Sequence, residues 1–417
     1  MSRFLPDILG QHLEELDELL ARRAHGFRTG APQAKQVVDL DARILAHADG
    51  LVVAGTEALP LLRQALEEGD PGQVVGAAFA LTRSPEEGVA AKAVAQLGSA
   101  GDAEALALAA RYAPAAAGAV DVELERLARE GTPQVAGVAL AALARRDRLA
   151  GPQPLTKLLE GDDAGAARWA LEAVAHLPGG EHEAAAATGR MGSALRRWAR
   201  ESEGATREAA LHAAAWTAQQ WLPAALRSSA AEPAGPLGPE HALLAALGDP
   251  EDLEWAQALA ANEALGPARF GVLALHGHPK LLPLLVTWME SQDPATAAVA
   301  ADAYTLLSGA PMFVVGKRVS ANPDDDFAED HAVPDLPRAR AHCASTEPAF
   351  AAEPRWLRGR PEPSWHPLDG ELTLAERVAL GVGRRMRGAW DGRRASIDAF
   401  PLQTGAQAAP PAARRRR

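Results

Sequence analysis

Short breaks rich in Gly, Pro and Asp divide most of this chain into stretches of roughly ten to fifteen residues, each with apolar residues at helical spacing. In one stretch Leu59, Leu62 and Leu66 share a helix face, and the stretch ends at Gly69-Asp70-Pro71. A second stretch then runs to Leu81. Similar breaks follow at Gly98 to Asp102, Gly131-Thr132-Pro133, Gly151-Pro152, Gly161-Asp162, Pro178-Gly179-Gly180, Gly248-Asp249-Pro250 and Asp293-Pro294. The pattern predicts successive pairs of α-helices joined by turns.

The composition favours helices over sheets. Hydrophobic residues make up 47% of the chain but aromatic residues only 5%, so Ala, Leu and Val supply most of the apolar surface. Ala and Leu form helices readily, and small side chains let helices pack closely, whereas strands favour β-branched and aromatic residues. We expect several helices to begin after Asp-Pro or Thr-Pro, because Asp or Thr caps free N–H groups and Pro fits the first turn.

Helical pairs of this kind cannot bury their apolar faces alone, and stacking the pairs side by side buries them. A period of about 30 to 50 residues is typical of HEAT and armadillo arrays. We therefore predict an all-α chain, an α-solenoid of HEAT-like helical pairs, with a non-repeating helical domain as the alternative. The expected segments are an N-terminal helical cap (1–54), HEAT-like repeats (55–310) with a break near 223–239, an acidic loop or linker (311–354), and a C-terminal helix followed by a poorly ordered basic tail (355–417).

Charge is unevenly distributed along the chain. From Arg355 onward there are 13 arginines and six acidic residues, a net charge of +7. Because the whole chain has a formal net charge of −12, the residues before Arg355 have a net charge of −19. An acidic body repels nucleic acid and suits a basic protein partner, but surface acidity also serves solubility alone. We expect no nucleic-acid partner, and we expect a protein partner if the charge has a binding role.

Cys343 is the only cysteine, which excludes an internal disulfide and a cysteine-based zinc site and fits a reducing compartment. The segment from Met1 to Leu13 contains Asp7 and lacks a basic region followed by a continuous apolar core, so it does not resemble a signal peptide. No apolar run approaches the roughly 20 residues of a membrane helix. These features predict a cytoplasmic chain without a membrane partner.

The sequence contains no convincing catalytic motif. It lacks HExxH, GxSxG, a phosphate-binding loop and a GxGxxG between a strand and a helix. His276 and His278 flank Gly277, with His241 upstream, but no carboxylate nearby completes a metal site, so a helix-to-helix turn is the simpler interpretation. We predict no enzyme activity, no cofactor and no metal.

Tryptophans and an acidic run are the candidates for partner binding. Trp216 and Trp221 flank a polar Gln pair before the central break, and Trp is a preferred interface anchor, although tryptophans also fill gaps between Ala-rich helices. Asp324, Asp325 and Asp326 could dock a basic partner or form a solvated loop. The four arginines at the C-terminus fit nucleic acid, anionic lipid or a disordered tail that binds neither.

The opening residues carry a more specific pattern. His12, Glu14 and Glu15 lie in the first expected helix, and a Leu-Asp-x-Arg-x-x-Ala-His-x-Asp-Gly-Leu segment runs from Leu40 to Leu51. Over about the first 65 residues the chain resembles a family of bacterial HEAT-repeat proteins, and the resemblance continues more loosely through the repeats. Members of that family are often encoded beside type VI secretion spike and PAAR-domain effector genes, and some look like immunity proteins.

The resemblance implies a cytoplasmic, protein-binding solenoid that acts as an immunity or accessory protein for a type VI secretion effector, with a secreted toxin or a spike component as its partner. No binding residue can be carried over, because such surfaces vary with the toxin. A general scaffold for a cytoplasmic complex is the alternative. A HEAT-like lyase or DNA glycosylase is a third hypothesis, which the acidic body and the missing motifs disfavour.

Overall fold

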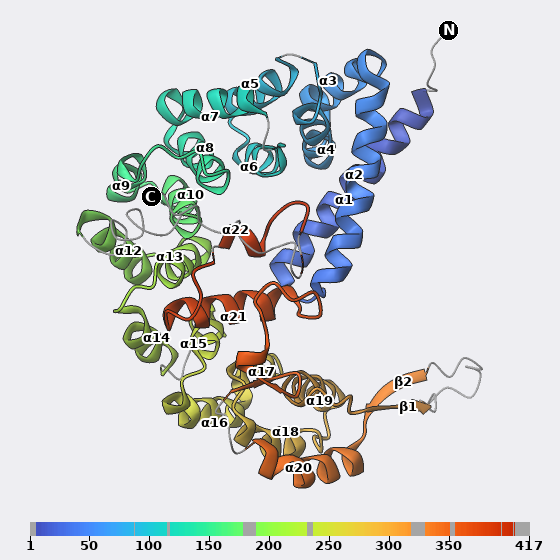
Figure 1. Ribbon diagram of the computed structural model, residues 1–417, viewed down its shortest axis with the longest axis vertical. Helices are drawn as coiled ribbons and strands as arrows, with labels where there is room; N and C mark the ends of the chain where they lie inside the picture. Colours follow the sequence, from blue (N-terminus) through green and yellow to red (C-terminus); the bar gives the residue numbers. More distant parts are fainter. Residues whose placement is uncertain are drawn as a thin grey trace, which may run out of the picture. The chain divides into compact units, whose positions relative to one another are not determined.

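The computed structural model describes residues 6–86, 88–114, 117–177, 189–231, 237–317, 330–350, 355–392, 394–402 and 404. These residues are mostly helical, as predicted (Figure 1). The strands among them form two short antiparallel pairs, so the described part of the chain is not purely α-helical. The prediction for the end of the tail concerns residues 405–417, which lie outside the described ranges.

The chain forms two compact units. Unit 1 comprises Met1–Gln220 and Pro367–Arg417, and unit 2 is Trp221–His366. The boundary lies just before the predicted break near 223–239. The predicted 355–417 segment is divided between the units, because its first part packs in unit 2 and its helix packs in unit 1.

The helices of unit 1 follow the breaks seen in the sequence. In chain order they are α1 Pro6–Thr29, α2 Ala34–Ala54, the 3-10 turn η1 Gly55–Glu57, α3 Leu59–Glu68, α4 Pro71–Thr82, α5 Val89–Ala100, α6 Ala103–Tyr112, α7 Gly118–Glu130, α8 Pro133–Arg145, α9 Gln153–Glu160, α10 Ala164–Ala175, α12 Gly189–Glu201, α13 Gly204–Trp216, α21 Leu374–Met386 and α22 Arg394–Ile397.

The predicted caps are present at the helix starts. Oδ1 of Asp70 accepts hydrogen bonds from the N–H groups of Gly72 and Gln73, both at 3.0 Å, and Pro71 begins α4. Thr132 caps α8 and Asp163 caps α10 in the same way, through the N–H group three residues later. Each cap satisfies donors that the first helical turn leaves free, which is why these short helices begin at fixed positions.

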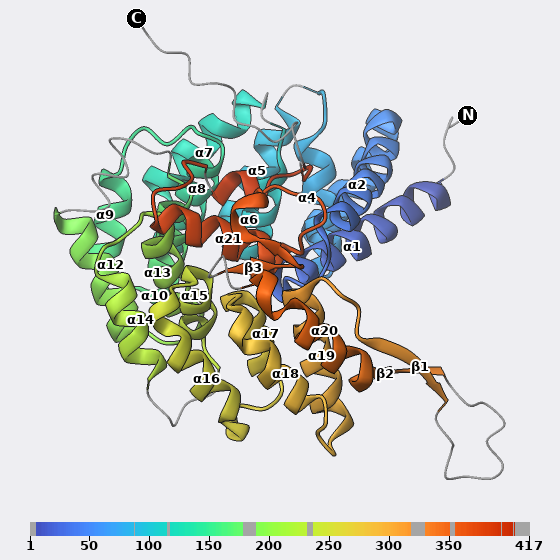
Figure 2. The same ribbon diagram turned by 60° about the horizontal axis from the view of Figure 1, so that its bottom comes forward.

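Alternate helices of unit 1 form two rows. We call α4, α6, α8, α10 and α13 the inner row, because each packs against the next. The outer row is α3, α5, α7, α9 and α12, and each of these helices packs on the inner helix that follows it. α21 packs on α13 of the inner row (Figures 1 and 2), and Asp398, which follows α22, lies against α6, α8 and the end of α10.

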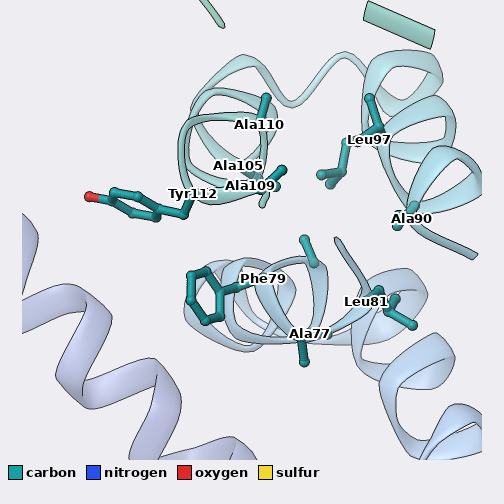
Figure 3. Packing of buried hydrophobic residues seen from close by; sticks show 14 of the residues in the cluster. Ala77, Phe79, Leu81, Ala90, Leu97, Ala105, Ala109, Ala110 and Tyr112 are labelled. Atoms are coloured by element: carbon teal, nitrogen blue, oxygen red, sulfur yellow. The ribbon is translucent and has the colours of Figure 1, made fainter. Parts of the chain in front are cut away.

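Small residues let the inner helices approach closely. A Cβ atom built on Gly137 of α8 would lie 2.9 Å from the carbonyl oxygen of Ala166 in α10. Ala77 of α4 and Ala109 and Ala110 of α6 are fully buried, and Figure 3 shows their cluster with Phe79 and Tyr112 at one edge. Alanines therefore supply much of the buried surface of the inner helices.

Unit 2 is also built mainly from helices. Its elements are α14 Leu222–Ala230, α15 Pro239–Leu247, η2 Pro250–Asp252, α16 Leu253–Ala261, η3 Glu263–Leu265, α17 Arg269–His276, η4 Pro279–Leu281, α18 Leu282–Trp288, α19 Pro294–Ser308, β1 Phe313–Lys317, β2 Asp330–Pro334, α20 Leu336–Phe350, β3 Trp356–Leu357, β4 Arg360–Pro361 and η5 Glu362–Ser364. Phe270, Leu285 and Tyr304 are central in its core. The guanidinium of Arg355 donates to the carbonyl groups of Ala246 and Leu275, near the ends of α15 and α17.

The interpretation of 311–354 as a loop or linker is wrong for its described part. β1 and β2 form an antiparallel pair in which Phe313 faces Pro334 and Lys317 faces Asp330, and α20 follows and packs on α18. The apolar run from Phe313 to Val315 is short, and the prolines and acidic residues around it led us to expect a break. Tertiary contacts with α18 and α19 stabilise elements whose local signal is weak.

Candidate functional site

The predicted partner-binding residues belong to different parts of the chain. Trp216 ends α13 and is only 4% exposed, with its ring 6.1 Å from that of Trp390, so it belongs to the core of unit 1. Trp221 begins unit 2 and is partly buried. Asp324, Asp325 and Asp326 lie outside the described residues. Of the two tryptophans, Trp216 fits the alternative reading in which such rings fill gaps between Ala-rich helices.

A buried carboxylate next to α22 lies against two arginines and a histidine from three inner helices. Asp398 is 6% exposed. Nη2 of Arg111 lies 3.1 Å from its Oδ2, and Nη1 of Arg145 lies 3.0 Å from its Oδ1, an ion pair without hydrogen-bond geometry. Nε2 of His176 lies 3.3 Å from Oδ2. We call Arg111, Arg145 and His176 the carboxylate site.

Electrostatics keep Asp398 charged in this place. Burial acts to raise the pKa of Asp398, but Arg145, His176 and Arg111 hold it well below its ordinary value. Burial and the neighbouring Arg145 lower the pKa of His176 to about 4, so at neutral pH its ring has one proton. Nδ1 of His176 is also 2.8 Å from the carbonyl oxygen of Glu172. Because the neutral ring has a single N–H group, His176 can donate to the Glu172 carbonyl or to Asp398, but not to both.

Glu172 and Arg394 complete the charge cluster. Burial acts to raise the pKa of Glu172, and Arg394, His176 and the two site arginines lower it to about 2, so it is ionised. Nη2 of Arg394 is 3.8 Å from Oε2 of Glu172, and its Nε is 3.8 Å from Oδ2 of Asp398. Arg394, which begins α22 four residues before Asp398, therefore balances the negative charge of Glu172 in α10.

An aromatic pocket lies two residues further along the chain. The ring of Phe400 is 5.5 Å from that of Phe79 in α4 and 4.8 Å from that of Tyr112 in α6, measured between centroids. The guanidinium of Arg23 in α1 lies 5.0 Å from the Phe400 ring. Such aromatic and cation–π contacts add to the burial of the ring. Three helices thus supply the surroundings of one side chain.

A buried ion pair holds the backbone on both sides of Phe400. Arg23 and Asp41 have fully buried side chains, and Nε of Arg23 donates to Oδ1 of Asp41 at 2.6 Å. Nη2 of Arg23 also donates to the carbonyl oxygen of Ala399 at 2.8 Å. The N–H group of Leu402 donates to Oδ2 of Asp41 at 2.7 Å. The pair therefore binds one backbone acceptor and one backbone donor.

These contacts together hold a short piece of chain, Ile397–Leu402, which we call the docked segment; Ile397 ends α22, and the residues after it lie outside any helix or strand. Asp398 and Leu402 are buried and Phe400 is partly buried, whereas Pro401 is exposed. Leu402 packs with Ala34, Val37 and Leu374. The side chains of Asp398, Phe400 and Leu402 each contact other elements of unit 1, and Ile397 is buried as well. The arrangement can recognise a carboxylate, an aromatic ring and two backbone groups in a fixed order.

The sequence reasoning missed this site because it lies in the part of 355–417 that was predicted to be a poorly ordered tail. That prediction is wrong for the described residues here, since Ile397, Asp398 and Leu402 are buried. A signal is nevertheless present in the inner helices: Arg83, Arg111, Arg145 and His176 stand at the C-terminal ends of α4, α6, α8 and α10. A basic residue at the same place in successive repeats forms a column when the helices pack side by side. The occupant, Asp398, could not be deduced, because its partners are 222 and 287 residues away in the chain.

Of the two histidines at the α17 turn, His276 is the last residue of α17 and is buried. His278 caps the following turn, with Nδ1 accepting from the N–H group of Lys280 at 3.2 Å. Across the described ranges, no group of three His, Cys, Asp or Glu residues is arranged to hold a metal ion.

No single described helix is long and apolar enough to cross a membrane. The pair 34–57 and 59–68, bent by 109°, reaches that length and hydropathy only when the two helices are taken together.

Comparison of the chain with known protein families, with curated proteins and with solved structures finds no match to any of them. What the fold and the site define together is a mostly helical protein in which the inner row and the first two helices hold a short segment that follows α22.

Proposed function

We propose that this chain is a non-enzymatic, protein-binding α-solenoid of HEAT-like helical pairs. The repeated packing of inner on inner and outer on inner helices supports the solenoid. The observation that carries the binding function is the docked segment: the inner row and the first two helices hold six residues of the chain by two side-chain pockets and two backbone hydrogen bonds. Those are the means by which a groove binds a peptide.

The resemblance of the opening residues supports a narrower proposal. His12 and the Leu40 to Leu51 segment are similar to bacterial HEAT-repeat proteins encoded beside type VI secretion effectors. The chain then acts in the cytoplasm as an immunity or accessory protein, and its partner is a secreted toxin or a spike component. The alternative is a general scaffold for a cytoplasmic complex, which would bind its partner without neutralising it.

Affinity capture followed by co-expression tests both levels. The tagged full-length chain is purified from a lysate of its source cells at low and moderate salt, and co-purifying proteins are identified by mass spectrometry. A secreted toxin that the chain neutralises in co-expression supports the immunity role. A specific partner whose activity is unchanged supports the scaffold. Recovery of no specific partner at either salt concentration contradicts a protein-binding function.

A further inference from the structure

We propose that the surface formed by Arg23, Arg111 and Arg145 recognises a segment of the partner protein that carries a carboxylate and, two residues later, an aromatic ring, and that Ile397–Leu402 is a built-in competitor for this surface. This inference rests on the proposed binding function and specifies the chemistry of the element that is bound. Its basis is the charge, spacing and backbone pattern of the docked segment.

The charge balance requires an anionic occupant. If the docked segment leaves, Asp398 and Arg394 leave with it, and the inner helices retain the guanidinium groups of Arg111 and Arg145 against the single carboxylate of Glu172. Ionised groups in a largely buried setting are costly unless each has a partner. An incoming segment must therefore supply a negative group at the position of Asp398.

The second requirement is an aromatic side chain two residues after the carboxylate, at the position of Phe400. The pocket of Phe79, Tyr112 and Arg23 presents two ring systems and a cation to one side chain. The Arg23–Asp41 pair binds a carbonyl group before that side chain and an N–H group after it, which any peptide can supply unless proline occupies the second position. Backbone contacts give affinity, and the two pockets give specificity.

The docked segment has little structure of its own. α22 has four residues, and Asp398 to Leu402 follow it outside any helix or strand. Its placement therefore depends on contacts with the receptor groups. Because it is tethered to the same chain, its effective concentration is high, and a partner must compete with it. The apparent affinity for the partner equals its affinity for the free surface multiplied by the fraction of molecules in which the surface is free.

A peptide-binding experiment on the full-length chain tests the proposal. The probe is a fluorescent peptide with the sequence of residues 394–404, and the proteins are the wild type and the Asp398→Ala/Phe400→Ala variant, whose internal competitor is weakened. We expect the variant to bind the peptide at least tenfold more tightly than the wild type does. A peptide with Ala in place of the aspartate should bind at least tenfold more weakly than the unchanged peptide.

Two receptor substitutions in the variant background locate the binding surface. Arg145→Gln removes a cation of the carboxylate site and should abolish peptide binding. Arg168→Gln is the matched control: Arg168 lies on α10 but is ion-paired with Glu104 at an exposed position, and its loss should leave binding unchanged. If both substitutions weaken peptide binding equally, or if neither changes it, the proposed surface is wrong.

Hydrogen exchange keeps the test decisive if the double variant does not fold. Excess peptide added to the wild-type chain should displace the docked segment, so the amide of Leu402, which donates to Asp41, should exchange faster. No acceleration at any peptide concentration would mean that the segment is a permanent part of the core and that the proposal is wrong.

The partner capture experiment separates the two proposals. A partner recovered in larger amounts with the Asp398→Ala/Phe400→Ala variant than with the wild type supports the competitor. A partner recovered equally with both leaves the binding function standing and overturns the competitor. If light scattering shows that the wild type dimerises and that the variant does not, the occupant is the segment of a second copy, which overturns the commitment to a different partner.

Discussion

Replacement of Asp398 by Ala tests whether the charge cluster stabilises unit 1 through the docked segment. The carboxylate lies within 3.3 Å of three basic side chains. Removing one partner of a buried ion pair costs about 3–5 kcal/mol, because the other charges stay buried. The side chains of Arg111 and Arg145 are 25% and 13% exposed, so water compensates part of the loss, and we expect about 2–4 kcal/mol.

The assay is calorimetric thermal unfolding of the full-length chain at neutral pH. For a unit of this size, each kcal/mol lowers the melting temperature by about 2–4 °C, so the transition of unit 1 should move down by roughly 5–15 °C. Asp398→Asn keeps the shape and an acceptor but loses the charge, and it should give about half the shift. The matched control is Asp162→Ala, at a 97% exposed side chain, with an expected change below about 0.5 kcal/mol.

A double-mutant cycle distinguishes the ion pair from packing. Arg145→Met combined with Asp398→Ala should destabilise less than the sum of the single changes, with a coupling of about 1–3 kcal/mol. Additive effects, or a shift for Asp398→Ala as small as that of Asp162→Ala, would refute the reasoning that the cluster depends on this carboxylate.

Three further changes test other parts of the structure. Burial lowers the pKa of His176 and of His212 in α13 to about 4, with Arg145 and Arg394 as the neighbouring charges. As pH falls, these histidines take up protons in the unfolded chain first, so unit 1 should lose stability between about pH 6.5 and 4, by at most about 3 kcal/mol per histidine. His212→Met should flatten this dependence of the melting temperature on pH. Gly137→Ala should destabilise by about 1–3 kcal/mol in urea unfolding because its Cβ would meet the backbone of α10, whereas Gly10→Ala, with open space around it, should stabilise by up to about 1 kcal/mol; stabilisation by both would contradict the close helix approach. Phe400→Ala should cost about 2 kcal/mol in calorimetry and Phe400→Leu about half as much, and equal costs would show that ring contacts do not matter.

Local signals predicted the helices well. Asp70, Thr132, Asp163 and Asp293 cap helices at the breaks that the sequence displays, because a cap depends on residues two or three positions away. The hairpin of β1 and β2 was missed, since its apolar runs are short and its stability depends on neighbours in unit 2.

Long-range contacts set the limit for the site. Nothing near Asp398 in the sequence indicates that it meets Arg111 and His176, and nothing near Trp216 indicates that Trp390 covers its ring. The prediction that Trp216 anchors a partner relied on residue type alone. The column of basic residues in successive inner helices was visible in the sequence, but its meaning depends on the row in which those helices pack.

Hydrogen exchange of the full-length chain, with and without its captured partner, tests most directly whether the inner row is the binding surface. The account predicts that the partner changes protection at the C-terminal ends of α6, α8 and α10 and in the docked segment, and leaves the outer helices α5, α7 and α9 unchanged. Changes confined to the outer row or to unit 2 would contradict it.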